Sequence, residues 1–279
     1  MSEKRKKSIS IAIPASLVSE YKNLRDKTLT IGTIARAASI YRVDNIYIFK
    51  DKPDESALIR DLLNYVETPQ YLRKKMFGLR PEYKFVGLLN PLRTPHHPRE
   101  RYSKNLENKE FREGILVSKE KGENYVDIGV DRLLKVKGKS PSVGNRVTAQ
   151  IIDKKLMVGR FASLSEIKKY WGYKVHMHKG VFSKLSGNFP LRIATSREGV
   201  NYTTVSDKMN FDWKNAKKVF IAFGSPRKGL KEILSYKKGH LDSHFDYELN
   251  MVPNQGTATV RSEEAIHATL AILNLLDSV

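Results

Sequence analysis

The chain of 279 residues can form one large domain or two moderate ones, and its 40% hydrophobic residues can fill a core, which excludes disorder throughout. It contains no cysteine, which excludes disulfides, thiolate zinc sites and cysteine nucleophiles. Its 50 Lys and Arg against 30 Asp and Glu leave a net charge of +20, which indicates a polyanionic partner.

The N-terminal segment MSEKRKKSIS carries four consecutive cations, from Lys4 to Lys7, and no apolar run follows it. We therefore expect no signal peptide, and we expect these cations to contact phosphate groups. No stretch approaches the roughly 20 apolar residues that a membrane span requires, so we expect no membrane partner and a cytoplasmic location.

The first part of the chain alternates between strand and helix signals. Isoleucines alternate with small residues over 9–13, which predicts a strand. After it we expect, in chain order, a helix opened by Pro14 over residues 15–23, a second helix after Thr28 or Thr30, a strand over 45–50 and a helix over 53–66. This alternation indicates an α/β sheet.

The pattern changes near Pro91. A proline-rich stretch without periodicity over 91–108 predicts a linker, in which we expect His96 and His97 to be exposed. Five short β-like runs separated by turn signals follow, at residues 114–118, 125–130, 133–136, 146–152 and 156–159. Five strands in about fifty residues, with no long helix, predict a small β-barrel of the OB kind.

Basic residues make this predicted barrel a candidate for RNA contact. Small basic barrels commonly bind RNA along a strand face, so we expect contacts from Lys135, Lys137, Lys154 and Lys155. Trp171 lies among lysines just after the barrel, and two interpretations of it stay open. It stacks on an RNA base, or it fills the seam between the barrel and the α/β part.

The C-terminal part returns to an α/β pattern. It predicts strands over 191–195, 218–223 and 247–252, followed by a helix over 262–279. This helix is apolar on nearly all sides, so we expect the core and a partner subunit to bury it.

Each of these three strands is followed by a loop of small and polar residues, namely TSREG at 195–199, GSPRKG at 224–229 and NMVPNQGT at 250–257. Ligands collect outside the carboxyl ends of strands in open α/β sheets, so the three loops are expected to build one pocket. The second loop is not a Walker A loop, because Leu230 follows Gly229 where a lysine is required, and the chain has no G-x-G-x-x-G.

The strings AFGSPRKGLKEIL at 222–234 and NMVPNQGTATVRSEEAIHATLAILN at 250–274 resemble the SPOUT class of RNA methyltransferases. With TSREG and the opening strand ISIAIP, they resemble the archaeal and eukaryotic branch that carries an inserted β-barrel. The resemblance spans most of the chain. It implies a homodimer of an α/β fold with a C-terminal trefoil knot, here a methyltransferase domain over residues 1–92 plus 168–279 with an inserted OB-like barrel over 93–167.

The resemblance also implies that S-adenosyl-L-methionine binds in the knot, held by the three loops. Carried over to this chain, the implied cofactor contacts are Thr195, Ser196, Arg197, Gly224, Ser225, Gly229, Asn250, Met251, Val252, Gln255, Gly256, Thr257 and Val260. Methyl transfer from a sulfonium needs no metal, so we expect no metal site. It requires in-line alignment and removal of a proton from the acceptor.

Two arginines flank the proposed pocket. Arg197 and Arg261 are the catalytic candidates, to orient a phosphate or to stabilise a deprotonated acceptor, and Arg197 is preferred because it lies within a cofactor loop. Glu198 and Glu264 are possible bases. The segment from His240 to Asp246 has residue types that can bind zinc, but its neighbouring lysines favour a polar loop.

We therefore expect an enzyme that transfers a methyl group from S-adenosyl-L-methionine to structured RNA, ribosomal or transfer. The alternative is a non-enzymatic RNA-binding or ribosome-assembly factor that retains the fold. The sequence leaves open whether a base or the ribose 2′-oxygen is methylated.

Overall fold

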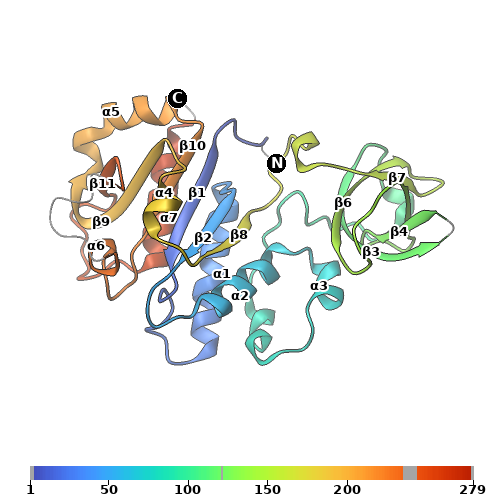
Figure 1. Cartoon of the computed structure of the whole chain (residues 1–279), viewed down its shortest axis with the longest axis horizontal. Helices are drawn as coiled ribbons and strands as arrows, with labels where there is room; N and C mark the ends of the chain where they lie inside the picture. The colour runs from blue at the N-terminus through green and yellow to red at the C-terminus, as the bar shows by residue number, and fades with distance from the viewer. Residues whose placement is uncertain (1–2, 121, 235–243, 278–279) are drawn as a thin grey trace. The chain divides into compact units, whose positions relative to one another are not determined.

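The structure is a computed structural model that describes residues 3–120, 122–234 and 244–277. The chain divides into two compact units (Figure 1). The first, here called the barrel unit, comprises Met1–Lys4, Glu67–Arg80 and Leu92–Trp171. The second, here called the sheet unit, comprises Arg5–Val66, Pro81–Pro91 and Gly172–Val279.

The sheet unit contains six parallel strands in the order β11-β9-β10-β1-β2-β8. Their bounds are β1 Ser8–Pro14, β2 Asn45–Phe49, β8 Lys174–His178, β9 Leu191–Asn201, β10 Lys218–Ala222 and β11 Tyr247–Asn250. The central strand β1 is buried from Ile9 to Pro14, as expected for a parallel strand that is covered on both faces.

Helices cover both faces of this sheet (Figure 1). Their bounds are α1 Leu24–Ile40, α2 Ser56–Glu67, α4 Phe182–Ser186, α5 Tyr202–Asn215, α6 Leu230–Ile233 and α7 Ser262–Leu275, with 3-10 turns η1 Pro81–Tyr83 and η2 Val86–Leu88. Phe182 of α4 and Leu230 of α6 pack in one apolar cluster with Phe220 of β10. The helices α1 and α7 pack against each other.

The segment after β1 differs from the prediction. Residues 15–20 form successive turns, and α1 begins at Leu24, where the Asn23 side chain accepts a hydrogen bond from the Asp26 N–H at 2.8 Å. The Ala15 N–H donates to Phe49, and the Ala15 carbonyl accepts from Glu55. The predicted helix over 15–23 is wrong because these backbone groups bond to a neighbouring strand and loop. The helix predicted after Thr28 or Thr30 exists but begins earlier.

The barrel unit contains a closed five-stranded barrel in the order β3-β4-β5-β7-β6, which confirms the predicted barrel. The strands are β3 Phe111–Glu120, β4 Glu123–Asp127, β5 Leu134–Lys137, β6 Arg146–Asp153 and β7 Val158–Phe161, and the other elements are α3 Gln70–Met76, η3 Ser103–Asn105 and η4 Leu164–Glu166. At Gly159 a Cβ atom would lie 2.7 Å from the Gln150 carbonyl oxygen, so the contact between β6 and β7 requires glycine there.

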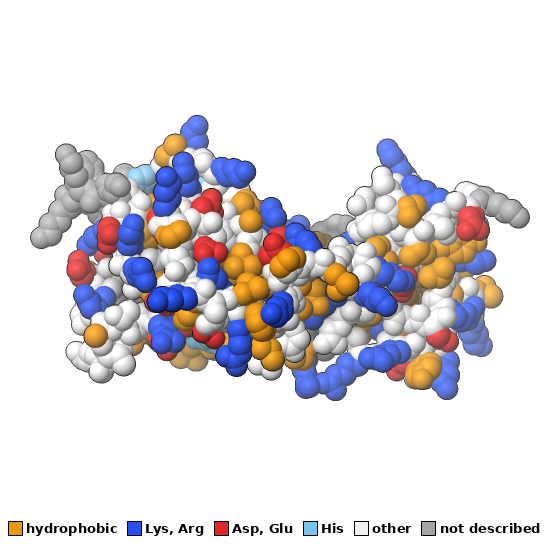
Figure 2. Space-filling view, turned by 90° about the horizontal axis from the view of Figure 1, so that it is seen from below, with side chains coloured by type: hydrophobic (Ala, Val, Ile, Leu, Met, Phe, Trp, Pro, Cys, Tyr) orange, Lys and Arg blue, Asp and Glu red, His pale blue; other side chains and the backbone are white. Residues whose placement is uncertain are grey.

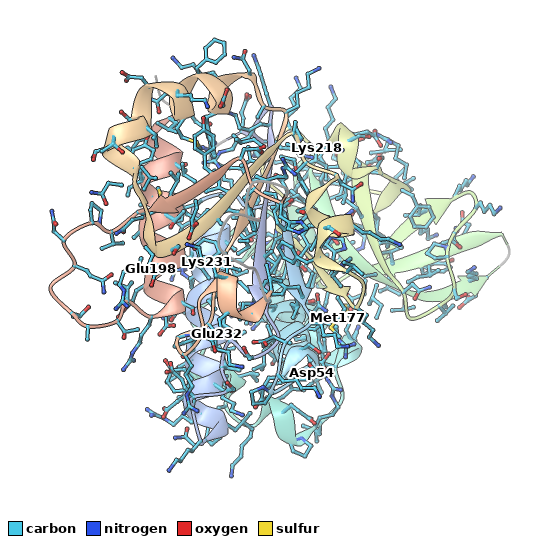
Figure 3. The ribbon with its side chains drawn as sticks, turned by 60° about the vertical axis from the view of Figure 1, so that its left-hand side comes forward. Asp54, Met177, Glu198, Lys218, Lys231 and Glu232 are labelled. Atoms are coloured by element: carbon cyan, nitrogen blue, oxygen red, sulfur yellow. The ribbon has the colours of Figure 1, made fainter. Side chains whose placement is uncertain are left out.

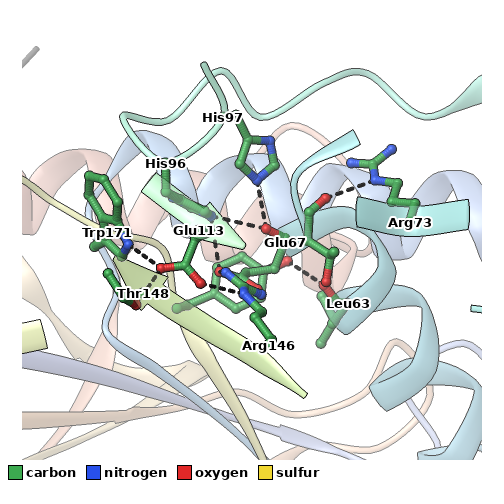
Figure 4. A network of polar contacts seen from close by, with 11 residues as sticks. Leu63, Glu67, Arg73, His96, His97, Glu113, Arg146, Thr148 and Trp171 are labelled. Atoms are coloured by element: carbon green, nitrogen blue, oxygen red, sulfur yellow. Dashed lines mark hydrogen bonds and ion pairs between the residues drawn. The ribbon is translucent and has the colours of Figure 1, made fainter. Parts of the chain in front are cut away.

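A buried polar network joins Glu67, the last residue of α2, and the linker to the barrel (Figure 4). Glu67 accepts hydrogen bonds from Arg146 at 2.6 Å and lies 3.0 Å from Nε2 of His96. Glu113 accepts from Arg146, from the Thr148 hydroxyl and from the Trp171 indole N–H, each at 2.6 Å. These hydrogen bonds give several polar groups the partners that they would otherwise lack in the barrel core.

The two linker histidines belong to this network, so their predicted exposure is wrong. His96 is 0% exposed, and Nε2 of His97 lies 2.6 Å from the Glu67 carbonyl oxygen. Burial, with a contribution from His96, lowers the pKa of His97 to about 3, so its ring is neutral. The proline-rich composition correctly predicted a segment without regular secondary structure. It did not predict the contacts of this segment with residues far away in the sequence.

None of the helices in the described ranges combines the length and the apolar character that crossing a membrane requires.

Candidate functional site

Three loops meet at one edge of the parallel sheet. Two of them follow the carboxyl ends of β10 and β11, whereas the TSREG segment, predicted to follow a strand over 191–195, lies inside the longer strand β9. The strands β10 and β11 are the two neighbours of β9 in the sheet. Residues 195–198, 223–232, 249–252, 255 and 258–260 line a single cavity of about 460 Å³, together with residues of α7. This volume lies within the usual range for small-molecule sites, roughly 300–1,000 Å³.

Most of the predicted cofactor residues lie at this cavity. Those that line it are Thr195, Ser196, Arg197, Gly224, Ser225, Gly229, Asn250, Met251, Val252, Gln255 and Val260. Gly256 and Thr257 belong to the third loop but are absent from the lining; the Gln255 side-chain amide donates to the Thr257 carbonyl oxygen at 2.8 Å.

The first loop is formed by an irregularity between β9 and β11. Glu248 pairs with Ala194, but the next residue, Leu249, pairs with Val200, so residues 195–199 leave the regular ladder. A Cβ atom on Gly199 would lie 2.8 Å from the Glu248 carbonyl oxygen, which only glycine permits at this close approach. The irregularity therefore turns the TSREG segment toward the cavity.

Hydrogen bonds tie this loop to its neighbours. The Thr195 hydroxyl donates to the Ala222 carbonyl at the end of β10, at 3.0 Å. The Asn250 amide donates to the Arg197 carbonyl, and the Arg197 guanidinium donates to the Ala258 carbonyl, each at 3.0 Å. The three segments thus hold one another in place without a ligand.

The second loop is a compact turn closed on α7. The Ser225 N–H donates to the Lys228 carbonyl at 2.9 Å, and the Ser262 hydroxyl of α7 donates to the Gly224 carbonyl at 3.2 Å. A Cβ atom on Gly224 would lie 2.8 Å from the Lys228 carbonyl oxygen. Glycine at this position therefore has a structural reason, since a larger residue would displace the turn.

The cavity wall combines apolar surface with charged side chains. Phe223, Leu249 and Met251 contribute apolar surface. Glu198, Lys231 and Glu232 also line it (Figure 3), and Lys231 forms an ion pair with Glu248 at 3.0 Å. This mixture suits a ligand with both apolar and polar parts.

Among the lining residues that were not named from the sequence, Thr269 is notable for its chemistry. Thr269 of α7 is 1% exposed, and its hydroxyl lacks a hydrogen-bond partner in the part of the chain that the structure describes. A buried hydroxyl without a partner is costly, so a ligand that pairs with it would gain affinity. In the sequence, Thr269 is only a small residue on an apolar helix. Its place at the cavity could not be predicted, because the side of α7 that faces the cavity depends on the three-dimensional packing.

The two candidate catalytic arginines are placed differently. Arg197 lines the cavity, whereas Arg261 is exposed and outside its lining. Arg261 precedes α7, where its backbone N–H donates to the Glu264 carboxylate at 2.9 Å. The structure thus brings Arg197, and with it Glu198, to the candidate site.

The predicted RNA contacts lie in the barrel unit. Lys135, Lys137 and Lys155 are exposed, Lys154 is half-buried, and Lys135 lies 3.9 Å from the Glu123 carboxylate. Trp171 is half-buried, with its indole N–H on Glu113. Lysines and arginines are spread over the visible face of both units (Figure 2).

Two of the N-terminal cations are engaged inside the sheet unit. Arg5 forms an ion pair with Asp277 at 2.5 Å, and the Lys7 ammonium donates to the Trp213 carbonyl and lies 4.5 Å from the ring centroid of Trp213. The expectation that these two cations contact phosphate is therefore wrong. Their partners lie far away in sequence.

Within the described residues, no group of three or more His, Asp and Glu side chains is arranged to hold a metal ion. Most of the segment from His240 to Asp246, considered above for zinc, lies outside the described residues.

The chain matches the sequence model of a family described as "Putative RNA methyltransferase" over residues 8–273. It is 30% identical to the 28S rRNA (uridine-N(3))-methyltransferases of Drosophila melanogaster and Homo sapiens, in each case over 95% of this chain; the match covers 61% of the fly protein and 77% of the human protein. The crystal structure of the SpoU methyltransferase AviRb from Streptomyces viridochromogenes with AdoMet aligns with a TM-score of 0.39 and 9% identity, over 98% of this chain and 59% of that one. The family model and the human relative confirm the relationship to RNA methyltransferases that the C-terminal motifs indicated, and the chain belongs to this RNA methyltransferase family.

Proposed function

We propose that this protein transfers the methyl group of S-adenosyl-L-methionine to N3 of a uridine in ribosomal RNA. The observation that carries the proposal is the single cavity formed by the three loops, in a chain of this family. The names of the fly and human relatives support uridine N3 as the acceptor.

The cavity suits the cofactor in size and chemistry. Apolar side chains such as Met251 and Val260 can cover the adenine, while Asn250, Gln255 and backbone groups can bond to its polar edges. When bound, S-adenosyl-L-methionine supplies a methyl group on a positively charged sulfur. The unpaired Thr269 hydroxyl adds a hydrogen-bonding group to this set. Gly256 and Thr257 stay predictions from the resemblance.

The acceptor requires a second function, because N3 of uridine carries a proton that must leave during methylation. Arg197 in the cavity wall can stabilise the negative charge that then develops on the uracil ring. Glu198 beside it is a carboxylate that can accept the proton. We therefore assign the catalytic roles to this loop and not to Arg261.

We also propose that the protein forms a homodimer, contains a trefoil knot and is located in the cytoplasm. The dimer is supported by exposed apolar side chains on two helices that pack against each other. Leu275 of α7 is 64% exposed, and Ile40 of α1 is 49% exposed. Burial of such apolar side chains by a second subunit would be favourable.

The proposal is tested by kinetics of methyl transfer from tritium-labelled S-adenosyl-L-methionine to unmodified large-subunit rRNA. We expect Arg197→Ala to lower kcat by about 100-fold, the effect of removing one group that stabilises developing charge. Its calorimetric affinity for the cofactor should fall by less than kcat does, because the guanidinium contributes to the cofactor loops through the Ala258 carbonyl but acts mainly on the acceptor.

The matched control is Arg261→Ala, which should keep kcat within about threefold, since this side chain is outside the cavity lining. A wild-type protein that binds no cofactor, or an Arg197→Ala variant as active as wild type, would contradict the assignment.

A further inference from the structure

An exposed tyrosine of the barrel unit lies beside one lysine, on a linker segment that is hydrogen-bonded to a loop carrying a further cation. Tyr102, in the linker just before η3, is 58% exposed, and the Lys104 ammonium lies 5.7 Å from its ring centroid. The other cations are Arg101, Arg132 and Lys155, which are exposed. We call these five residues the Tyr102 patch.

Three separate segments form this patch. The Asp131 N–H donates to the Arg101 carbonyl at 3.0 Å, which joins the linker to the loop after β4. The Arg132 guanidinium donates to the Lys155 carbonyl at 3.1 Å, which joins that loop to the turn between β6 and β7. Backbone contacts therefore hold the patch on the rigid end of the barrel.

The carboxylates near the patch are engaged with backbone groups. Glu100 accepts from the N–H groups of Arg101 and Tyr102, and Asp131 accepts from the Ser103 N–H. These hydrogen bonds lower the pKa of both carboxyl groups. Within the described ranges no ion pair joins these four exposed cations to a carboxylate, although the charge of Arg132 helps to lower the pKa of Asp131. Their charges can therefore meet an external anion.

We propose that the Tyr102 patch binds an unpaired nucleotide of the RNA substrate, with its base stacked on Tyr102 and neighbouring phosphates on the four cations. An exposed aromatic ring among cations is the arrangement that binds single-stranded RNA without reading its sequence. This inference rests on the proposed RNA substrate. It extends the predicted RNA contacts, of which only Lys155 belongs to the patch.

Trp171 and Tyr102 are the two aromatic residues considered for stacking on an RNA base. The Trp171 ring has its N–H on the buried Glu113 and lies 5.8 Å from the ring centroid of His96, so packing and hydrogen bonding restrain it. Tyr102 is the more accessible of the two rings. The patch therefore assigns the stacking role to Tyr102.

The test is fluorescence anisotropy with the full chain and a labelled oligouridylate of about ten nucleotides, with a labelled RNA duplex as second probe. We expect Tyr102→Ala to bind the single strand about tenfold more weakly and Tyr102→Phe to bind it as wild type does, because the ring is retained. Binding of the duplex should change by less than about twofold.

The cations are tested through salt dependence. Arg132→Gln should reduce the slope of log K against log salt for the single strand by about 0.7, the value for one phosphate contact. The control is Lys119→Gln, which removes an exposed lysine of β3 outside the patch and should leave that slope unchanged.

Failure of this inference is distinguishable from failure of the proposed function. If wild-type protein methylates rRNA but Tyr102→Ala binds the oligouridylate as tightly as wild type, the inference is overturned and the function stands. A Trp171→Phe variant that loses the binding while Tyr102→Ala keeps it would also overturn it. Equal competition by polyglutamate against wild type and Tyr102→Ala would indicate a general acidic partner and overturn the stacking role.

Discussion

The buried hydroxyl of Thr269 offers a test of whether the cofactor binds in the cavity. Among the residues that the structure describes, none pairs with this buried hydroxyl, so replacing threonine by the isosteric valine removes an unfavourable group. We expect Thr269→Val to stabilise the free protein by about 1 kcal/mol, which raises its Tm by roughly 2–4 °C. The same change should weaken cofactor binding about five- to tenfold, because a hydrogen bond to the ligand is lost.

Scanning calorimetry and isothermal titration measure the two effects, and Thr269→Ser is the control that keeps the hydroxyl and should keep the affinity. A valine variant with unchanged cofactor affinity would show that the hydroxyl faces no ligand.

His97 makes the stability of the barrel unit depend on pH. Its pKa is lowered from 6.5 to about 3 by burial, so protons bind preferentially to the unfolded chain between these values. The stabilisation is present above pH 6.5 and is lost as pH falls toward 3, with a slope of up to about 1.4 kcal/mol per pH unit.

We expect His97→Gln to flatten this slope between pH 6.5 and 4.5, measured by urea unfolding at a series of pH values. The control is His178→Gln, in β8 of the sheet unit. An equal slope in wild type and His97→Gln would contradict the account.

Among the elements, the second loop depends most strongly on one glycine. A Cβ atom at Gly224 would lie too close to the Lys228 carbonyl, so alanine forces the turn to shift. Such overpacking typically costs about 1–3 kcal/mol, and we expect Gly224→Ala to weaken cofactor binding by about tenfold or more.

Gly87→Ala, in η2, is the matched control, since a Cβ atom there meets nothing within 4 Å and the residue lies outside the cavity lining. Calorimetric titration should give it nearly wild-type affinity. Tight binding by Gly224→Ala would mean that the turn does not shape the site.

Elements with a strong local signal were predictable. Apolar β-branched runs identified five of the six parallel strands, all except β8, and the five barrel strands. The cavity was predicted because the three loops were expected at the carboxyl ends of strands. The helix α5 was missed because only Met209 and Trp213 are buried on it, which leaves little periodicity. The helix predicted over 15–23 does not form, because backbone hydrogen bonds of Ala15 with Phe49 and Glu55 outweigh the local helical pattern.

For the whole molecule, composition indicated a polyanionic partner but not where it binds. The buried histidines, the ion pair of Arg5 with Asp277 and the Tyr102 patch all join residues that are distant in the sequence. Most of the residues that the family resemblance implied line the cavity, whereas Thr269 and the Tyr102 patch could be identified only from the three-dimensional structure.

The most direct test of the central claim is mass spectrometry of nucleosides from unmodified large-subunit rRNA after incubation with pure protein and S-adenosyl-L-methionine. The account predicts 3-methyluridine that accumulates with time in the wild-type reaction and falls about 100-fold in rate with Arg197→Ala. If the protein binds the cofactor and the RNA, yet no methylated nucleoside forms, the chain is an RNA-binding factor and the proposed catalysis is contradicted.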